Sequence, residues 1–318
     1  MPETQNATPI SVIGLPYLMG TRAPGVYYQM AAGPERLLDP AALPAALGAH
    51  FADVETELIE DADDATDEDN GGDFRVLPRG DQMSRVLVQN MHLARRVADA
   101  RARGRFPLIA GGTCSSALGS VGGIGGSGKR VGMIWLDAHG DAQTPDTSAS
   151  GFIEGMPVTT IAGLCWPLWR AQIPGFEVIP EERIITVGNH EMHSPGGRLP
   201  ADGSPGALGR LVDPPAIAAQ GYHVALTEAL DDLATRADAV YVHLDPDVID
   251  PSEFRSSTHV ADGGLTIAQV AEAFREIAAR FEVLAINLSA WDPSVDPRGL
   301  DVLVPLLVDA TVEATTRS

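Results

Sequence analysis

The sequence has little of what several classes of protein require. Its 318 residues include two cysteines, Cys114 and Cys165, which excludes a disulfide-stabilised scaffold and fits a reducing compartment. No window approaches the ~20 consecutive apolar residues of a membrane-spanning helix. Residues 1–9 are polar and lack the apolar core of a signal peptide. We therefore expect a cytoplasmic protein with no membrane partner.

Positive charge is also scarce. The chain has 22 lysines and arginines against 43 aspartates and glutamates, a formal net charge of −21, and Lys129 is its only lysine. Such a balance argues against nucleic acid and anionic membranes as partners. The excess acid concentrates in residues 54–73, where we expect a solvated acidic loop (about 60–75). No linker rich in Pro, Gly and Ser divides the chain, so we expect residues 1–318 to form a single domain.

Short apolar runs alternate along the chain with segments of helical periodicity. The expected strands are 10–15, 51–59, 106–110, 131–136, 183–187, 239–244 and 283–288. The expected helices are one opening at Gly33, 81–103, one after Ser115, 157–164, 226–236, 266–281 and 300–315. This alternation predicts a largely parallel sheet covered on both faces.

Two acidic motifs each follow an expected strand. Asp137, His139 and Asp141 occupy alternate positions after one strand, and Asp245 and Asp247 follow another. The first motif alone is as well explained by a polar turn in which aspartate caps a helix. Together, four carboxylates and a histidine at two strand ends would repel one another strongly unless cations lay between them. Because ligands bind outside the carboxyl ends of parallel strands, we expect a divalent-metal site here.

These motifs resemble those of the ureohydrolase family, the arginase and agmatinase group of amidinohydrolases. The matching pieces, in the family's order, are GVYYQMAAGPERLL (25–38), GGTCSSALGS (111–120), WLDAHGDAQTPDTSASG (135–151), HLDPDVIDP (243–251) and LSAWDP (288–293). The resemblance implies an α/β fold, a three-layer αβα sandwich with a mostly parallel central sheet. It further implies two divalent metal ions, with manganese expected, and a homo-oligomer, a trimer or a hexamer.

The resemblance also implies roles for single residues. The implied metal ligands are Cys114, Asp137, His139, Asp141, Asp245 and Asp247. Asp137 and Asp245 would bridge the two metals, and water between the metals would be acidic enough to supply hydroxide. That hydroxide would attack a planar C–N carbon, with Asp141 carrying the proton. In arginases the products are urea and an amino acid.

Cys114 is the first departure from the family pattern, because GGTCS replaces the family's GGDHS and puts cysteine in the place of a histidine ligand. One interpretation is a small buried thiol beside a one-metal site. The other is a thiolate ligand, which would shift the metal preference toward zinc or iron. A few family members that act on N-hydroxyarginine-like substrates have cysteine at this position, so the exchange is compatible with activity.

The substrate-facing positions differ as well. Glu154 replaces the family's proton-shuttle histidine, and a carboxyl group could still relay protons if burial raises its pKa. Ala290 replaces the glutamate that pairs with the guanidinium in arginases, leaving Glu154 and, as a weaker candidate, Asp292 to supply negative charge. His190 and His193 stand where arginases have arginine and an amine-binding aspartate.

Two further positions bear on the substrate's other end. Gln143 and Ser150 fall where arginases place asparagine and serine against the substrate carboxylate. The expected substrate-binding residues are therefore Gln143, Ser150, His193 and Asp292, and the expected catalytic residues are Asp141 and Glu154.

Together these features favour a metal-dependent hydrolase of a linear C–N bond, a divergent amidinohydrolase acting on a non-standard guanidino or amidino small molecule. One alternative is a mononuclear zinc deacylase, which Cys114 and Ala290 favour and the retention of Asp141 and Asp247 disfavours. The other is a catalytically silent paralogue with a structural or partner role, which the replaced pocket residues suggest.

Overall fold

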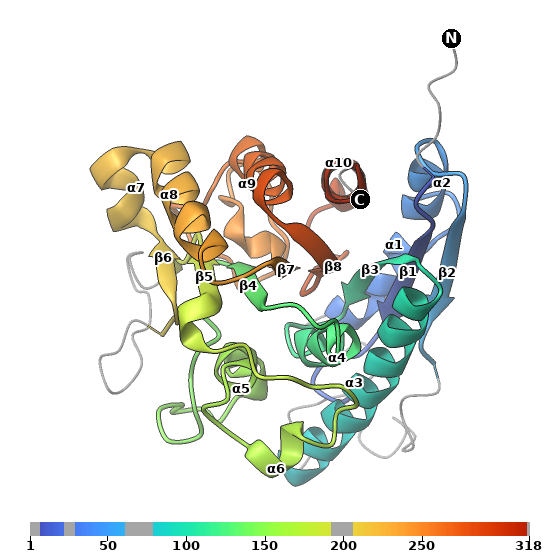
Figure 1. Ribbon diagram of the computed structural model, residues 1–318, viewed down its shortest axis with the longest axis horizontal. Coiled ribbons are helices and arrows are strands. Elements are labelled where there is room, and N and C mark those ends of the chain that lie inside the picture. Colours follow the sequence, from blue (N-terminus) through green and yellow to red (C-terminus); the bar gives the residue numbers. More distant parts are fainter. Residues whose placement is uncertain (1–6, 22–28, 61–78, 192–205, 317–318) are drawn as a thin grey trace.

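One parallel sheet organises the chain. The computed structural model describes residues 7–21, 29–60, 79–191 and 206–316, and within these ranges eight parallel strands follow the order β2-β1-β3-β8-β7-β4-β5-β6 (Figure 1). The strands are β1 (Ile10–Leu15), β2 (Val54–Leu58), β3 (Phe106–Gly111), β4 (Val131–Leu136), β5 (Ile184–Val187), β6 (Arg210–Val212), β7 (Ala239–Leu244) and β8 (Glu282–Leu288).

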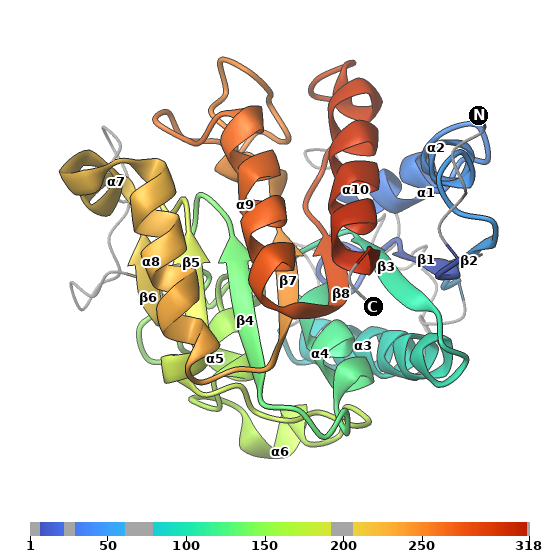
Figure 2. The ribbon, with the colours of Figure 1, turned by 45° about the horizontal axis from the view of Figure 1, so that its top comes forward.

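Helices cover both faces of this sheet (Figures 1 and 2). One face carries α1 (Gly33–Leu37), α2 (Leu43–Gly48), α7 (Pro214–Gln220), α8 (Tyr222–Ala234), α9 (Ile267–Arg280) and α10 (Gly299–Thr315). The other carries α3 (Arg79–Ala102), α4 (Ser116–Ile124), α5 (Pro157–Ile161) and α6 (Pro167–Arg170). The predicted three-layer αβα sandwich is therefore confirmed.

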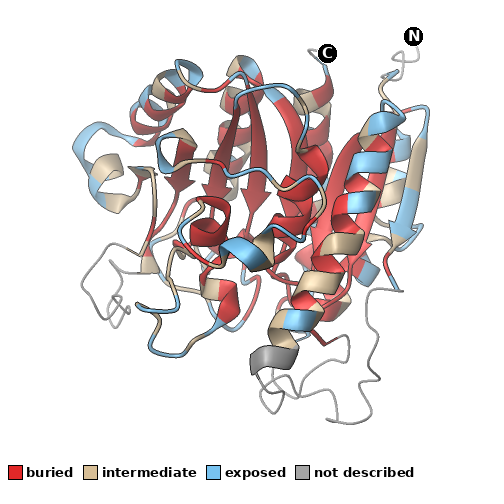
Figure 3. Cartoon of the chain, turned by 60° about the horizontal axis from the view of Figure 1, so that its bottom comes forward, coloured by how far each residue is buried: buried red, intermediate tan, exposed pale blue. Residues whose placement is uncertain are grey.

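The central strands are mostly apolar because both of their faces are covered. Side chains alternate between the faces of a strand, so Ile134 and Leu136 of β4 belong to the core on the side of α8 and α9, while Met133 and Trp135 belong to the core on the side of α3 and α4. The central strands in Figure 3 are accordingly buried, whereas the edge strands β2 and β6 are partly exposed. A sheet buried on both faces has two rims on which polar groups can gather.

The sequence-based boundaries are confirmed for most elements, with two kinds of difference. The edge strand β6 was not predicted, since three residues that begin with an exposed arginine give no strand signal. The short helices α2, α6 and α7 were missed, and each has proline in its first turn. Most of the predicted acidic loop lies outside the described residues. In the described part of the chain, no helix is long and apolar enough to cross a membrane.

Candidate metal centre

The two acidic motifs meet because their strands are neighbours. β4 and β7 pair in parallel, with Leu136 opposite Leu244, so Asp137 and Asp245 leave the sheet side by side at its carboxyl rim. On its other side β7 pairs with β8, and β3 follows beyond β8. The loop after β3 carries Cys114, which therefore reaches the same rim.

His139 forms the first group of ligand atoms with Asp137 and Asp247. Its Nδ1 lies 2.9 Å from Oδ2 of Asp247 and 3.3 Å from Oδ1 of Asp137. Backbone amides fix both carboxylates, since the amide of His139 donates to Asp137 (2.6 Å) and that of Ala138 donates to Asp247 (3.0 Å). An imidazole and two oriented carboxylates are suitable ligands for manganese, iron or zinc.

Cys114 forms a second group of ligand atoms with Asp137 and His243, all within 4.8 Å of one another. The thiol of Cys114 also lies 3.3 Å from Oδ2 of Asp245. The indole Nε1 of Trp135 donates to Oδ2 of Asp137 (2.9 Å), while the other oxygen of that carboxylate faces His139. Asp137 thus belongs to both groups, which is the position that a residue bridging two metals must have.

The buried carboxylates of these two groups have too few positively charged neighbours to compensate their own charge. Burial, together with the charge of Asp247, raises the pKa of Asp137 to about 7. Burial and neighbouring carboxylates also raise the pKa values of Asp141 and Asp245 well above their usual range. Burial alone would lower the pKa of His139, but the carboxylates of Asp247 and Asp137 more than offset it and raise that pKa. Divalent cations would relieve this repulsion, so the donor set fits a metal centre.

The loops around the centre adopt conformations that few residues tolerate. Asp141 has a φ of 44° and Ala290 a φ of 58°, both in the left-handed region that disfavours side chains with a Cβ. A Cβ on Gly140 would lie 1.9 Å from the carbonyl oxygen of Gly206, so only glycine allows the loop to pass there. Such strain concentrates at functional sites, where surrounding structure holds it in place.

A cleft of about 380 Å³ opens above the centre. Its lining includes the predicted site residues Cys114, His139, Asp141, Gln143, Ser150, Glu154, Asp245 and Asp247. Asp137 is fully buried beneath it, and His193 lies outside the described residues. Asp292 does not belong to the described lining, because its buried carboxylate accepts hydrogen bonds from the amide of Gln29 and from the amide and hydroxyl of Ser294. That geometry argues against the predicted substrate contact by Asp292.

Glu154 is the middle residue of a short 3₁₀ helix, η4 (Ile153–Gly155), and its carboxylate faces the loop that carries Cys114. Its carboxylate accepts bonds from the amide (2.7 Å) and hydroxyl (3.0 Å) of Ser115. Burial raises the pKa of Glu154, while the bonds from Ser115 and Thr113 oppose that rise. Both oxygens are engaged, so the carboxylate fixes the Cys114 loop rather than extending freely into the cleft.

Several residues of the cleft were not singled out in the sequence. Asn189, Glu191 and His259 line it, and Nε2 of His139 lies 3.6 Å from Oε2 of Glu191. His190, which the sequence suggested for the pocket, is buried with its ring nitrogens 2.6 Å from the carbonyl oxygen of Gly188 and 2.8 Å from that of Ala261. Asn189 and Glu191 could have been predicted from the sequence, because they directly follow the strand β5. No local sequence feature identifies His259 as a residue of the cleft.

His243 of β7 is fully buried and lies beneath the centre. Its ring stacks on Trp135 with centroids 3.6 Å apart and planes 5° apart. Burial lowers the pKa of His243 to about 3, so the imidazole is neutral. A neutral imidazole in contact with the centre is able to act as a ligand.

Comparisons with known proteins agree with this geometry. The model of the arginase family matches residues 8–314. Arginase of Bacillus caldovelox is 29% identical over 295 residues, covering 91% of this chain and 93% of that protein. Its crystal structure aligns with a TM-score of 0.73 at 26% identity, covering 97% and 98% of the two chains. Formimidoylglutamase of Bacillus subtilis shares the fold at 18% identity, with a TM-score of 0.65 and coverage of 99% and 88%. The family match thus runs from before β1 into α10.

Proposed function

The chain belongs to the arginase family, and on this premise we propose that it is a metal-dependent amidinohydrolase that cleaves a linear C–N bond in a non-standard guanidino or amidino small molecule. One observation carries the proposal: two groups of ligand atoms share Asp137 at the base of a cleft large enough for a small molecule. A structural paralogue would have no need to retain buried, mutually repelling carboxylates, which are costly without a cation.

The proposed cofactor is a pair of divalent ions, manganese in the first place, with zinc or iron as alternatives because of Cys114. Asp137 and Asp245 would contact both ions, His139 and Asp247 would hold one, and Cys114 and Asp141 would hold the other. When bound, such a pair lowers the pKa of water enough to supply a nucleophile near neutral pH.

Asp141 is the proposed proton carrier. It lines the cleft, and burial together with the charge of Asp137 raises its pKa, so its carboxyl group holds a proton more readily than an exposed one. A carboxylate oxygen of Asp141 would take a proton from the attacking water and deliver it to the departing amine. The constrained backbone of Asp141 keeps this carboxyl group at one place in the cleft.

The substrate pocket supports a compound other than an ordinary cationic guanidine. Ala290 leaves no carboxylate at the position that pairs with guanidinium in arginases, and the oxygens of Glu154 are already bonded to the Cys114 loop. N-hydroxyguanidines and formimidoyl groups are less basic than guanidine and need less negative charge to bind. We therefore propose an N-hydroxyarginine-like or related amidino substrate, with Gln143 and Ser150 at its carboxylate end and His193 near its amine.

For Glu154, which the sequence suggested as a catalytic residue, the two bonds from Ser115 favour a role in positioning the loop of Cys114 over a proton shuttle. We further propose a cytoplasmic homo-oligomer, a trimer or a hexamer. The two free cysteines support the reducing compartment.

A substrate screen tests the proposed function. The full chain, loaded with manganese and in parallel with zinc, is incubated with L-arginine, agmatine, N-hydroxy-L-arginine and N-formimidoyl-L-glutamate. We expect release of an amine and the matching urea or amide from the N-hydroxy or formimidoyl compound in preference to arginine. Asp245→Asn provides the control and should abolish turnover. Turnover of acylated amines alone would contradict the proposal and favour a deacylase.

A further inference from the structure

The Cys114 half of the centre has a thiol where the first group has an imidazole, and the imidazole of His243 lies close to that thiol. We propose that His243 is a metal ligand of this half, where it supplies the nitrogen donor that position 114 lacks. With Cys114 and Asp137 it would form a sulfur-, nitrogen- and oxygen-containing site that prefers zinc-like ions to manganese. This inference rests on the metal centre of the proposed function.

The placement of His243 follows from its strand. It lies two residues before Asp245 on β7, so both side chains project from the same face of the sheet. The carboxyl end of β7 lies at the centre, and His243 is the last residue of β7 but one. Its ring is therefore one layer below the carboxylates of the centre, within reach of an ion bound between Cys114 and Asp137.

The orientation of the ring is fixed on two sides. The stack on Trp135 sets the plane of the imidazole, and the same indole donates to Asp137 through Nε1. The hydroxyl of Tyr241 lies 3.1 Å from Nδ1 of His243. Metal-ligating histidines have a partner on the nitrogen that does not bind the metal, and Tyr241 occupies that place. Nε2 is consequently directed toward the cysteine.

The hydroxyl of Ser289 contacts both the imidazole nitrogen of His243 and the sulfur of Cys114. Its Oγ lies 3.1 Å from Nε2 of His243 and 3.4 Å from Sγ of Cys114. A tetrahedral ion with bonds of about 2.0–2.3 Å holds its ligand atoms roughly 3.5 Å apart. The atoms of Cys114, Asp137 and His243 lie within 4.8 Å of one another, so binding needs a contraction of about 1 Å and a small rotation of the Ser289 hydroxyl.

The wild-type protein offers a direct count of the histidine ligands. The full chain, labelled with ¹⁵N in its histidines, is loaded with ¹¹³Cd²⁺, and scalar coupling between ¹¹³Cd and imidazole ¹⁵N identifies each bound ring. We expect two bound ions and two coupled rings, those of His139 and His243. Two bound ions with one coupled ring would overturn the inference and leave the proposed centre intact. Absence of bound cadmium would overturn both.

Three variants assign the second ring. His243→Phe, which keeps the stack on Trp135, should remove one coupled ring and reduce bound cadmium from two ions to one. Cys114→Ser should shift the resonance of the same cadmium ion. Ser289→Ala, the matched control, removes only the hydroxyl between the two donors and should retain both ions and both coupled rings. Persistence of two coupled rings in His243→Phe would overturn the assignment of His243. If that variant fails to fold, the number of coupled rings in the wild-type protein decides between one and two histidine ligands.

Discussion

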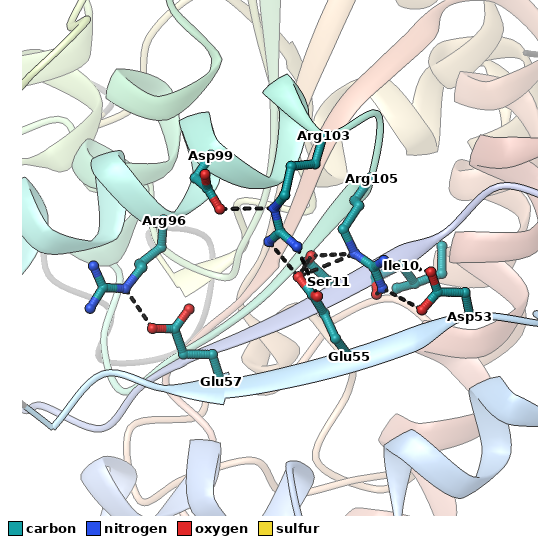
Figure 4. Close-up of polar contacts among 9 residues, drawn as sticks. All are labelled: Ile10, Ser11, Asp53, Glu55, Glu57, Arg96, Asp99, Arg103 and Arg105. Atoms are coloured by element: carbon teal, nitrogen blue, oxygen red, sulfur yellow. Dashed lines mark hydrogen bonds and ion pairs between the residues drawn. The ribbon is translucent and has the colours of Figure 1, made fainter.

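Two clusters of acidic residues in this molecule have opposite electrostatic character. In the first, Asp53, Glu55 and Glu57 lie along β2 and meet arginines of α3 and of the turn that follows it (Figure 4). Glu55 is bonded to Nη2 of Arg103 at 2.6 Å, and that contact lowers the pKa of Glu55 to about 2. In the second, at the metal centre, the pKa values of three aspartates are raised.

The difference lies in where the positive charge comes from. The first cluster is neutralised by arginines of the chain itself and stabilises the sheet edge. No lysine or arginine belongs to the described lining of the cleft, and His139 is the main positive partner of its carboxylates. Buried carboxylates that have no lysine or arginine partner in the chain are stabilised when a cation binds from solution. The comparison therefore separates structural acids from ligand acids within one chain.

The largest expected effect is on activity. Asp137→Ala removes the carboxylate shared by both groups of ligand atoms and should lower kcat/KM by at least about 10⁴-fold, or about 5 kcal/mol. Glu57→Gln, in the arginine-paired cluster, is the matched control and should leave kcat/KM within about twofold. If the two variants were equally well folded and lost kcat/KM to a similar extent, the distinction between ligand acids and structural acids would be contradicted.

Metal removal should reveal the opposite pH dependence of the two clusters. Asp137 has a pKa of about 7 in the folded chain against an ordinary value of 3.8. The folded state therefore binds protons more tightly than the unfolded state. The contribution of Asp137 to the free energy of unfolding is therefore greatest below pH 4. It falls as pH rises through about 7, by up to about 4 kcal/mol. The raised pKa of His139 acts in the same direction.

Denaturant titrations in a chelator at pH 5 and pH 8 measure this effect. We expect the metal-free chain to have a lower free energy of unfolding at pH 8, and bound metal to remove most of the difference. A metal-free chain that is more stable at pH 8 than at pH 5 would contradict the assignment of uncompensated charge to the centre.

An intermediate effect is expected from Glu154→Gln. In the new side chain a donor NH₂ group replaces one of the two accepting oxygens, so one of the bonds from Ser115 is lost and the Cys114 loop should loosen. We expect metal affinity to fall by about 10- to 100-fold, as it does when partners of metal ligands are removed, and the shape of the pH–rate profile to persist. Loss of one limb of that profile would instead assign a proton-shuttle role to Glu154.

The smallest effect is expected at the arginine-paired cluster. Arg103→Ala breaks a largely exposed pair, and solvent screens such pairs, so we expect only a small loss of stability. Because the folded pKa of Glu55 is lowered to about 2, this stability is present above pH 4.5 and is lost as pH falls toward 2. Urea titrations should show a small decrease of the unfolding midpoint at pH 7 that shrinks at pH 3. A decrease at pH 3 as large as that at pH 7 would contradict a role of the Glu55 charge in this pair.

The sequence predicted the centre of the sheet better than its edges. β4 and β7 were located to the residue because strands buried on both faces are mostly apolar, and their ends coincide with the aspartate motifs. β6 was missed because an edge strand of three residues has no such signature. The local sequence pattern therefore locates a strand when burial on both faces selects its residues. It fails for an edge strand that is held in place by pairing with its neighbour.

The same limit applies to the site. The aspartates could be assigned because each follows a strand within five residues. The bond that the carboxylate of Asp292 accepts from the amide of Gln29 joins two loops far apart in the sequence, so this competing role of a predicted substrate contact could not be foreseen. His243 has the alternation of a core residue, and its contact with Cys114 through Ser289 depends on the pairing of β7 with β8. Tertiary neighbours across strands are not visible in a single sequence.

The central claim is that the buried aspartates form a two-metal centre despite the cysteine at position 114. Elemental analysis tests it most directly: the purified chain is incubated with manganese and, separately, with zinc, then desalted and measured for bound metal. The account predicts close to two ions per chain with at least one of the metals. One ion per chain with both metals would contradict the binuclear centre, and no bound ion would contradict the metal-dependent function altogether.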